Sequence, residues 1–296
     1  ARVLRNPKGT APGLLLEAEG TRIALFPGVP RELHAIVEGD FAPFLDSIGG
    51  DAVHHRDVHT TGIFETKLAE ALEPSIGALP DELRSRVRVA YLPDIYGVDL
   101  RLTVRGGTVD EATDLFDRWM VGTAAVLDPW LFESTSGDIA EAVVSELRRT
   151  GRTLAVAESC TGGLVGQRVT AIPGSSEVFL GGVIAYANEV KIEHVGVSPD
   201  DLARDGAVSE VVARQLAGGV AERFGAGAGI GITGVAGPGG GSEEKPVGTV
   251  WIGICLDGVS EAFAARYPGD REAVRARAAQ AALAALYRKL LPAKRG

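Results

Sequence analysis

Predicted strands alternate with helical segments through the second half of the chain, and this alternation limits the possible folds more than any other feature. Runs of apolar or small residues at 152–157, 181–186, 227–233 and 248–256 predict strands, and helical patterns follow the first two. Strands that alternate with helices typically form a sheet with helices packed on its faces. We therefore predict a three-layer α/β domain in residues 138–296.

The first 137 residues are predicted to form smaller units. Residues 1–40 contain two short predicted strands and one helix, too little to bury a core, so we expect the C-terminal remnant of a larger α/β domain whose beginning is missing here. Residues 41–127 predict a small α+β domain with a strand at 51–60. Residues 128–137 predict a linker because of Pro129 and a Ser-Thr-Ser run.

Charge and cysteine content argue against several classes of protein. The formal net charge of −9 differs from that of general nucleic-acid binders, which are usually basic, so no nucleic-acid partner is expected. No apolar run approaches the ~20 residues of a membrane span, and no secretion leader is visible. Cys160 and Cys255 are the only cysteines, so we expect a reduced, cytoplasmic protein without membrane contact. His54, His55 and His59 fall on both faces of a predicted strand, and no metal site is predicted.

The first junction between a strand and a helix, at 158–163, combines a tight polar turn with two glycines. The first N–H groups of a helix lack partners within it, so they favour an anion or a developing oxyanion. Ser159 is therefore either the N-cap of the helix or a catalytic nucleophile. Gly162 and Gly163 favour the second interpretation, because they lower helix propensity and let a ligand approach closely. Cys160 is the alternative nucleophile.

A lysine follows the second such junction. Asn188 is the predicted N-cap of a helix that runs to about Val195, so Lys191 falls in the first turn. The helix dipole opposes a cation at that place, and both the dipole and burial would lower the pKa of the amine. A neutral amine can accept a proton. The alternative is an ordinary exposed lysine.

Residues 233–248 form a loop that is unusually rich in glycine and lies between two predicted strands. The loop matches neither the P-loop, which ends in Gly-Lys-Ser/Thr, nor a Gly-x-Gly-x-x-Gly motif that opens a helix. Loops between strands often carry binding groups, and Lys245 with its two neighbouring glutamates would not be needed in a spacer. Arg271, at the turn before the last helix, would either bind an anion or form a salt bridge with Asp270 or another carboxylate.

Five separated motifs occur together and in order: AESCTGG (157–163), YANEVK (186–191), GAVSE (206–210), GVAGPGGGSEEKPVGTV (234–250) and PGDR (268–271). Together they closely resemble the C-terminal domain of the CinA family, the nicotinamide mononucleotide (NMN) amidohydrolases or NMN deamidases. In the first half, NPKGTAPG and LFPGVPREL resemble the end of the family's molybdopterin-binding-like domain. Residues 41–127 resemble its KH-like domain.

The resemblance implies a role for each matched residue. Ser159 would be the catalytic serine, Lys191 its base and Arg271 a supporting active-site residue. The N–H groups of Cys160 and Thr161 would bind the oxyanion, and the glycine-rich loop would form a wall of the nucleotide pocket. The residues expected to bind substrate are Cys160, Thr161, Gly162, Gly163, Tyr186, Thr233, Gly234, Gly240, Gly241, Ser242 and Lys245.

The implied reaction converts NMN and water to nicotinate mononucleotide and ammonia, as in pyridine nucleotide salvage, in a bacterial homodimer that needs no metal or other cofactor. One alternative is a non-enzymatic adaptor in competence or recombination, which would not need Ser159 and Lys191 to be close in space. Another is an ADP-ribose pyrophosphatase acting through the first domain. The Gly-Gly-Leu-Gly-Pro-Thr stretch of that domain is absent from this chain, so we do not expect the pyrophosphatase activity.

Overall fold

A computed structural model of the protein describes residues 1–292. The last four residues of the predicted α/β domain therefore lie outside the described part. The chain divides into two compact units. The smaller combines residues 1–54 with 104–113, and the larger combines residues 55–103 with the chain from residue 114 onward. No helix in the described part is long and apolar enough to cross a membrane.

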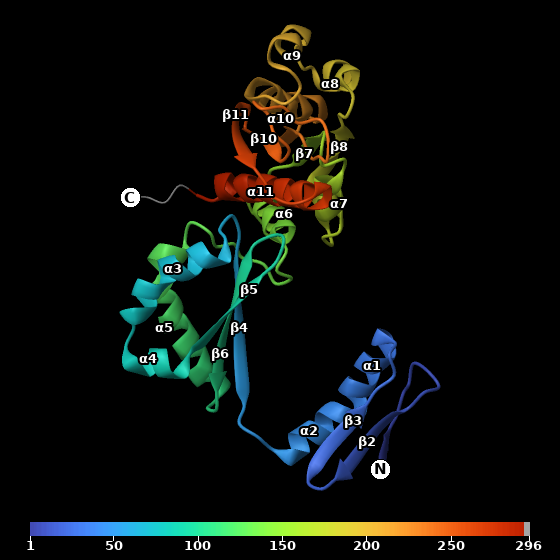
Figure 1. The fold of residues 1–296 in the computed structure, drawn as a ribbon, viewed down its shortest axis with the longest axis vertical. Helices are drawn as coiled ribbons and strands as arrows, with labels where there is room; N and C mark the ends of the chain where they lie inside the picture. The colour runs from blue at the N-terminus through green and yellow to red at the C-terminus, as the bar shows by residue number, and fades with distance from the viewer. Residues whose placement is uncertain (293–296) are drawn as a thin grey trace. The chain divides into compact units, whose positions relative to one another are not determined.

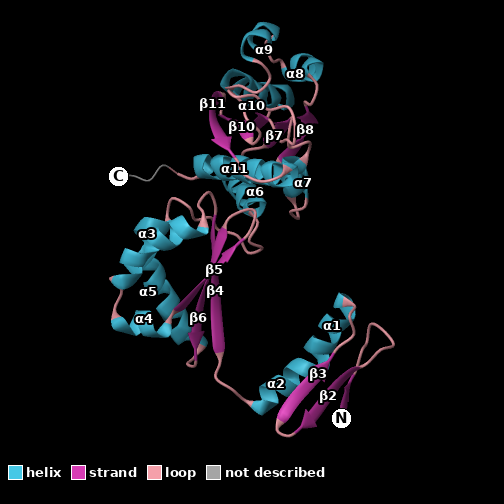
Figure 2. Ribbon diagram, viewed as in Figure 1, coloured by secondary structure: helices cyan, strands magenta, loops and turns pink. Residues whose placement is uncertain are grey.

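The smaller unit contains a three-stranded antiparallel sheet with the order β1–β2–β3 (Figure 2). The two short predicted strands correspond to β2 (Gly13–Ala18) and β3 (Thr21–Leu25), which form a hairpin. Glu19 and Gly20 make its turn with φ angles of +52° and +76°. The sequence pattern does not predict β1 (Arg2–Leu4), because three residues are too few to show a period.

The hairpin is followed by helix α1 (Pro30–Ile36), a π-helical turn (Val37–Phe41) and helix α2 (Ala42–Ile48). Leu4, Leu15 and Ile36 form a small buried core. Phe41 and Phe44 pack against this core, although the sequence analysis assigns them to the next domain. The boundary between the first two predicted domains remains a prediction.

The region predicted as an α+β domain contains a second three-stranded sheet, with the order β4–β6–β5 (Figure 1). β5 and β6 form an antiparallel hairpin. The short helix α4 is not predicted from the sequence. The strands are β4 (Val53–Thr60), β5 (Arg88–Pro93) and β6 (Val98–Arg105), and the helices are α3 (Glu65–Gly77), α4 (Asp81–Arg86) and α5 (Val109–Leu127).

The C-terminal domain has the predicted three-layer α/β architecture. Its five-stranded sheet has the order β11–β10–β9–β7–β8, in which β7 runs parallel to β8 and β9 while β10 is antiparallel to β9 and β11. Figure 1 shows α6, α7 and α11 on one side of this sheet and α8, α9 and α10 on the other. The strands are β7 (Leu154–Glu158), β8 (Phe179–Ile184), β9 (Ala228–Gly234), β10 (Thr249–Leu256) and β11 (Val259–Arg266). The helices are α6 (Ile139–Thr150), α7 (Leu164–Thr170), α8 (Asn188–Val195), α9 (Pro199–Asp205), α10 (Glu210–Phe224) and α11 (Arg271–Leu290).

The central strand β7 is buried on both faces, which explains its continuous apolar run. Leu154 and Val156 join the core that includes α6 and α11, whereas Ala155 and Ala157 join the core that includes α10. Small residues on this second face let α10 lie close to the sheet. A Cβ added at Gly231 of β9 would lie 2.5 Å from a backbone nitrogen of α10.

Candidate active site

The parallel strands β7, β8 and β9 end at one edge of the sheet. Glu158, the last residue of β7, is in register with Ile184 on β8 and Ile232 on β9. The polar turn after β7, the segment before α8 and the glycine-rich loop therefore begin side by side. In sheets of this kind, binding sites form beyond the carboxyl ends of the parallel strands.

Ser159 continues β7 by one residue and then begins a tight turn. Its backbone N–H donates to the carbonyl of Ile232 at 2.9 Å, and its own carbonyl accepts a hydrogen bond from Gly162 at 3.1 Å. Only 9% of Ser159 is exposed. Gly162 and Gly163 have φ angles of +60° and +95°, which favour glycine. The sheet and the turn together fix the backbone of Ser159.

A carboxylate of the protein itself occupies the start of α7. Glu158 is 1% exposed, and its side chain accepts hydrogen bonds from the backbone N–H groups of Gly163 (3.0 Å), Val165 (3.1 Å) and Gly166 (2.9 Å). Glu158 is not among the site residues predicted from the sequence. The sequence signal that could have identified it is its place at the end of a strand, just before a glycine turn and a helix, where a negative charge favours the helix N-terminus.

This arrangement corrects the sequence interpretation of the turn. Gly163 is the N-cap of α7, and Ser159 makes no capping hydrogen bond. The N–H groups of Gly163, Val165 and Gly166 are bound to Glu158 and are not available to an oxyanion. The N–H groups of Cys160 and Thr161 have no acceptor in any other described residue, so they remain the candidates for that role.

Replacing Glu158 by glutamine should destabilise the protein. Three N–H donors meet two carboxylate oxygens, whereas an amide offers one oxygen and brings its own N–H groups against the donors. We expect the free energy of unfolding to fall by about 2 kcal/mol, as for hydrogen bonds to charged groups, in urea denaturation. Glu193→Gln, at an exposed position, is the control and should change it by less than about 0.5 kcal/mol. Equal stabilities of the two variants would contradict this role of Glu158.

Lys191 is buried, with 1% of the residue exposed, so the alternative of an exposed lysine is wrong. Its Nζ donates to the backbone carbonyl of Tyr186 at 2.8 Å. Burial lowers the pKa of the amine, while the side chains of Cys160 and Glu189 oppose this shift. The predicted cap is also wrong by one residue, because Ala187 is the N-cap of α8 and no side chain caps the helix.

Lys191 and the Ser159 turn lie in the same neighbourhood. The side chain of Cys160, which follows Ser159 directly, is close enough to Lys191 to affect the pKa of its amine. In the described structure no hydrogen bond joins Ser159 Oγ to Lys191 Nζ. The predicted base is therefore near the turn of the predicted nucleophile, with its amine held by a backbone carbonyl.

Cys160 is a poor alternative nucleophile. Only 5% of the residue is exposed, and burial raises the pKa of its thiol to about 11. The negative charge of Glu158 adds to this rise in pKa, while a hydrogen bond from the residue's own backbone N–H and the positive charges of Arg275 and Arg271 oppose it. At neutral pH the thiol is therefore almost entirely protonated, and only the thiolate is strongly nucleophilic.

Arg271 joins two of the predicted site segments. One Nη atom donates to the carbonyl of Gly237 in the glycine-rich loop at 2.7 Å, and the other donates to the hydroxyl of Tyr186 at 3.0 Å. The predicted alternative, a salt bridge to Asp270 or another carboxylate, is not formed among the described residues. The Asp270 carboxylate instead accepts the backbone N–H of Ala273 and caps α11. Tyr186 thus contacts both Arg271 and Lys191.

Arg275 lies one helical turn after Arg271 and is not among the site residues predicted from the sequence. Its Nε and Nη2 atoms donate to the carbonyl of Thr161 at 3.3 Å and 2.8 Å. The spacing of four residues between the two arginines places them on the same face of α11. This spacing was the signal that could have identified Arg275.

The glycine-rich loop has its own internal contacts. Lys245 Nζ donates to the carbonyl of Asp205 at the end of α9, so the structure holds this predicted substrate-binding amine at a helix terminus. Thr233 is fully buried and its hydroxyl donates to the carbonyl of Ala207. Ser242 bonds to Lys245 within the loop. The other predicted binding residues of the loop are Gly234, Gly240 and Gly241, of which Gly240 has a φ of +83°.

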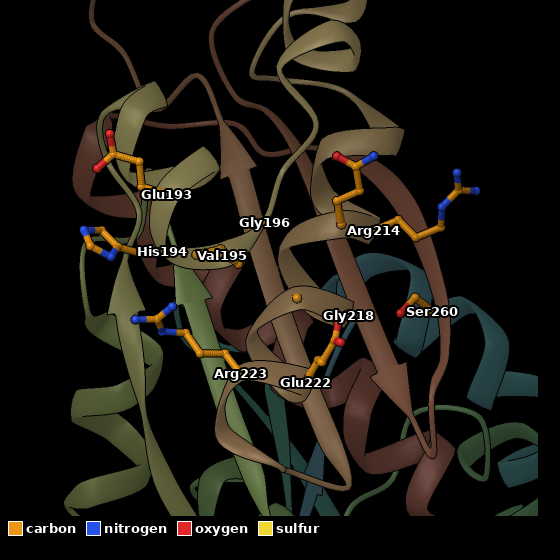
Figure 3. A pocket seen from close by; sticks show the side chains of 11 residues that line it. Glu193, His194, Val195, Gly196, Arg214, Gly218, Glu222, Arg223 and Ser260 are labelled. Atoms are coloured by element: carbon orange, nitrogen blue, oxygen red, sulfur yellow. The ribbon is translucent and has the colours of Figure 1, made fainter.

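A cavity of about 760 Å³ lies elsewhere on the domain and contains none of the predicted site residues. It is lined by the end of α8, by one side of α10 and by Ser260 of β11 (Figure 3). Its charged side chains have mixed signs, and Figure 3 shows Arg214 and Arg223 extending in opposite directions. These side chains do not converge on one point as a ligand site requires.

The described residues contain no group of three His, Cys, Asp or Glu side chains that could hold a metal ion. The three histidines of β4 have separate partners. A ring nitrogen of His54 bonds to the carbonyl of Gly107, His55 bonds to the hydroxyl of Thr103, and His59 lies 3.0 Å from the carboxylate of Asp99.

The fold and the site define a class of protein. Its members have an α/β domain that carries a serine turn, a buried lysine and an arginine beyond the ends of its parallel strands. Residues 136–290 match the family described as "CinA C-terminal domain", and residues 55–132 match the "Damage-inducible protein CinA KH domain". The chain belongs to the CinA family.

Similar proteins carry names of the same family. The chain is 43% identical over 290 residues to a "CinA-like protein" of Gemmatimonas aurantiaca, covering 97% of this chain and 67% of that protein. It is 42% identical over 294 residues to a "Putative competence-damage inducible protein" of Moorella thermoacetica, covering 98% and 69%. Among solved structures, a competence or damage-inducible protein from Enterobacter asburiae is 31% identical with a TM-score of 0.51, covering 54% of this chain and 100% of that one.

Proposed function

We propose that the protein hydrolyses the carboxamide of NMN to give nicotinate mononucleotide and ammonia. The observation that carries this proposal is the burial of Lys191 beside the Ser159 turn. A buried lysine without a carboxylate partner is costly in its charged form, so burial favours a neutral amine that can act as a base. The described residues provide Lys191 with no salt bridge.

The proposed reaction uses Ser159 as nucleophile. Its Oγ attacks the carboxamide carbon while the neutral amine of Lys191 accepts the hydroxyl proton, and the N–H groups of Cys160 and Thr161 stabilise the oxyanion. The carbon–nitrogen bond then breaks, and the Lys191 ammonium protonates the leaving nitrogen, which departs as ammonia. Water, deprotonated by the same amine, hydrolyses the ester on Ser159 to the carboxylate and restores the serine.

The nucleotide part of the substrate is proposed to bind at Arg271 and the glycine-rich loop. Arg271 is exposed at the start of α11 and is already held against the loop through Gly237. A guanidinium and the backbone N–H groups of a glycine-rich loop both suit a phosphate. Contacts to this remote group would supply binding energy for the reaction at the carboxamide.

The assay that tests this function follows ammonia release from NMN. We expect turnover that persists in EDTA, because the proposed steps use only side chains and backbone N–H groups. Free nicotinamide, which lacks the ribose phosphate, should react far more slowly. Loss of turnover in EDTA, or equal rates with nicotinamide, would contradict the proposal. A wild-type protein that releases no ammonia from NMN would favour the adaptor.

A further inference from the structure

We propose that Arg275 is a positioning residue for this reaction: it fixes the turn 159–162, which presents Ser159 and the two N–H groups of the oxyanion site. The inference deepens the proposed function and rests on it. Arg275 would act through the turn and not on the substrate, because its Nε and Nη2 atoms donate to the carbonyl of Thr161 within the turn.

The hydrogen bonds from Arg275 fix the orientation of the Thr161 carbonyl. Two nitrogens of the guanidinium, Nε and Nη2, donate to one carbonyl oxygen at 3.3 Å and 2.8 Å. A rigid planar group that donates through two atoms restricts the peptide between Thr161 and Gly162 more than a single flexible donor would. The contact also joins segments 114 residues apart, so α11 carries the position of the turn.

The turn needs such support because its own bonds hold only its ends. Ser159 is bonded to Ile232, and the Gly162 N–H closes the turn on the Ser159 carbonyl. Gly162 and Gly163, where the turn ends, have positive φ angles and the conformational freedom of glycine. Between these ends, the Thr161 carbonyl is bound by Arg275. Loss of this bond would let the peptide rotate and would move the neighbouring N–H groups.

The positive charge of Arg275 acts at the same place. Arg275 lies close enough to Cys160 to favour the thiolate, against the larger effect of burial. A charge that favours an anion at this position would also favour an oxyanion bound by the N–H groups of Cys160 and Thr161. Geometry and charge therefore point to a role in the transition state rather than in substrate binding.

The test compares Arg275→Ala and Arg275→Lys with Arg223→Ala, a control at an exposed arginine of α10. For Arg275→Ala we expect kcat on NMN to fall roughly 30- to 100-fold, as for a misplacement of about 1 Å, while KM changes less than about threefold. The pKa seen in the pH profile of kcat/KM should stay unchanged, because Lys191 is untouched. Arg275→Lys should recover part of kcat, because its amine can donate once to the same carbonyl. Arg223→Ala should match wild type.

Each outcome either supports or overturns the positioning role of Arg275. Wild-type kcat in Arg275→Ala would overturn the positioning role while leaving the NMN hydrolysis intact. A rise in KM with unchanged kcat would assign Arg275 to substrate binding instead and would also overturn it. If Arg275→Ala does not fold, Arg275→Lys must still lower kcat about three- to tenfold at unchanged KM, and wild-type kcat in that variant would overturn the role. An inactive wild type would overturn both the function and the inference.

Discussion

Ser159→Ala and Lys191→Ala should each lower kcat on NMN by about three orders of magnitude or more, because one removes the nucleophile and the other its base. The double variant should be little worse than either single variant, because groups that act as a unit are not additive. Steady-state ammonia release from NMN by the four proteins measures these effects. Additive losses would show that the two side chains act independently and would contradict the proposed pair.

Two further variants separate the candidate groups at the same site. Cys160→Ala should keep most of the activity, because alanine retains the backbone N–H and the buried thiol is protonated at neutral pH. Lys191→Arg should be nearly inactive, because a guanidinium cannot act as a base near neutral pH. If Cys160→Ala is as inactive as Ser159→Ala and its circular dichroism is normal, the nucleophile would be Cys160.

The sequence predicts the framework of the site because the framework depends on periodicity. Each predicted strand of the C-terminal domain has its counterpart in β7–β11, and the apolar run at 152–157 becomes β7, which is buried on both faces. Parallel strands place their carboxyl ends together, so Ser159 and the segment that carries Lys191 come to the same edge of the sheet. The sequence left open whether Lys191 is buried or exposed, and the structure shows it buried.

The sequence does not predict which polar groups satisfy each helix terminus. Ser159 and Asn188 have good capping side chains, yet the caps are Gly163 and Ala187. Glu158 reaches the start of α7 only because the turn bends the chain back over its carboxylate, and this geometry depends on positive φ angles that residue spacing does not specify. Several side chains compete for the same N–H groups, and the folded turn selects among them.

Contacts between distant segments are the other part that the sequence leaves open. Arg275 and Thr161 meet across 114 residues, and Arg271 contacts Tyr186 across 85. A long cationic side chain can extend in many directions, so its sequence position does not define its partner. The amine of Lys245 illustrates this, since the structure places it on the carbonyl of Asp205 at the end of α9.

The rate of NMN hydrolysis should rise with pH. Burial lowers the pKa of Lys191 from the ordinary value of 10.5, and only the neutral amine can accept the proton of Ser159. We therefore expect kcat/KM to increase as pH rises through the lowered pKa and to level off below pH 10.5. A thiolate nucleophile at Cys160, with a pKa of about 11, would give a rate that still climbs above that pH. Rates measured across pH distinguish the two, and a profile without a plateau below pH 10.5 would contradict the lysine base.

The same shift should appear in the pH dependence of stability. Between the lowered pKa of folded Lys191 and the ordinary pKa of 10.5, the unfolded chain binds more protons than the folded one, so the free energy of unfolding rises with pH across this interval. Lys191→Met fills similar space without a titrating group. Wild type should therefore gain stability relative to Lys191→Met as pH increases through the interval, in urea denaturation at several pH values. A constant difference between the two proteins would show that the pKa of Lys191 is the same in both states, and a base acting near neutral pH would then have to be another group.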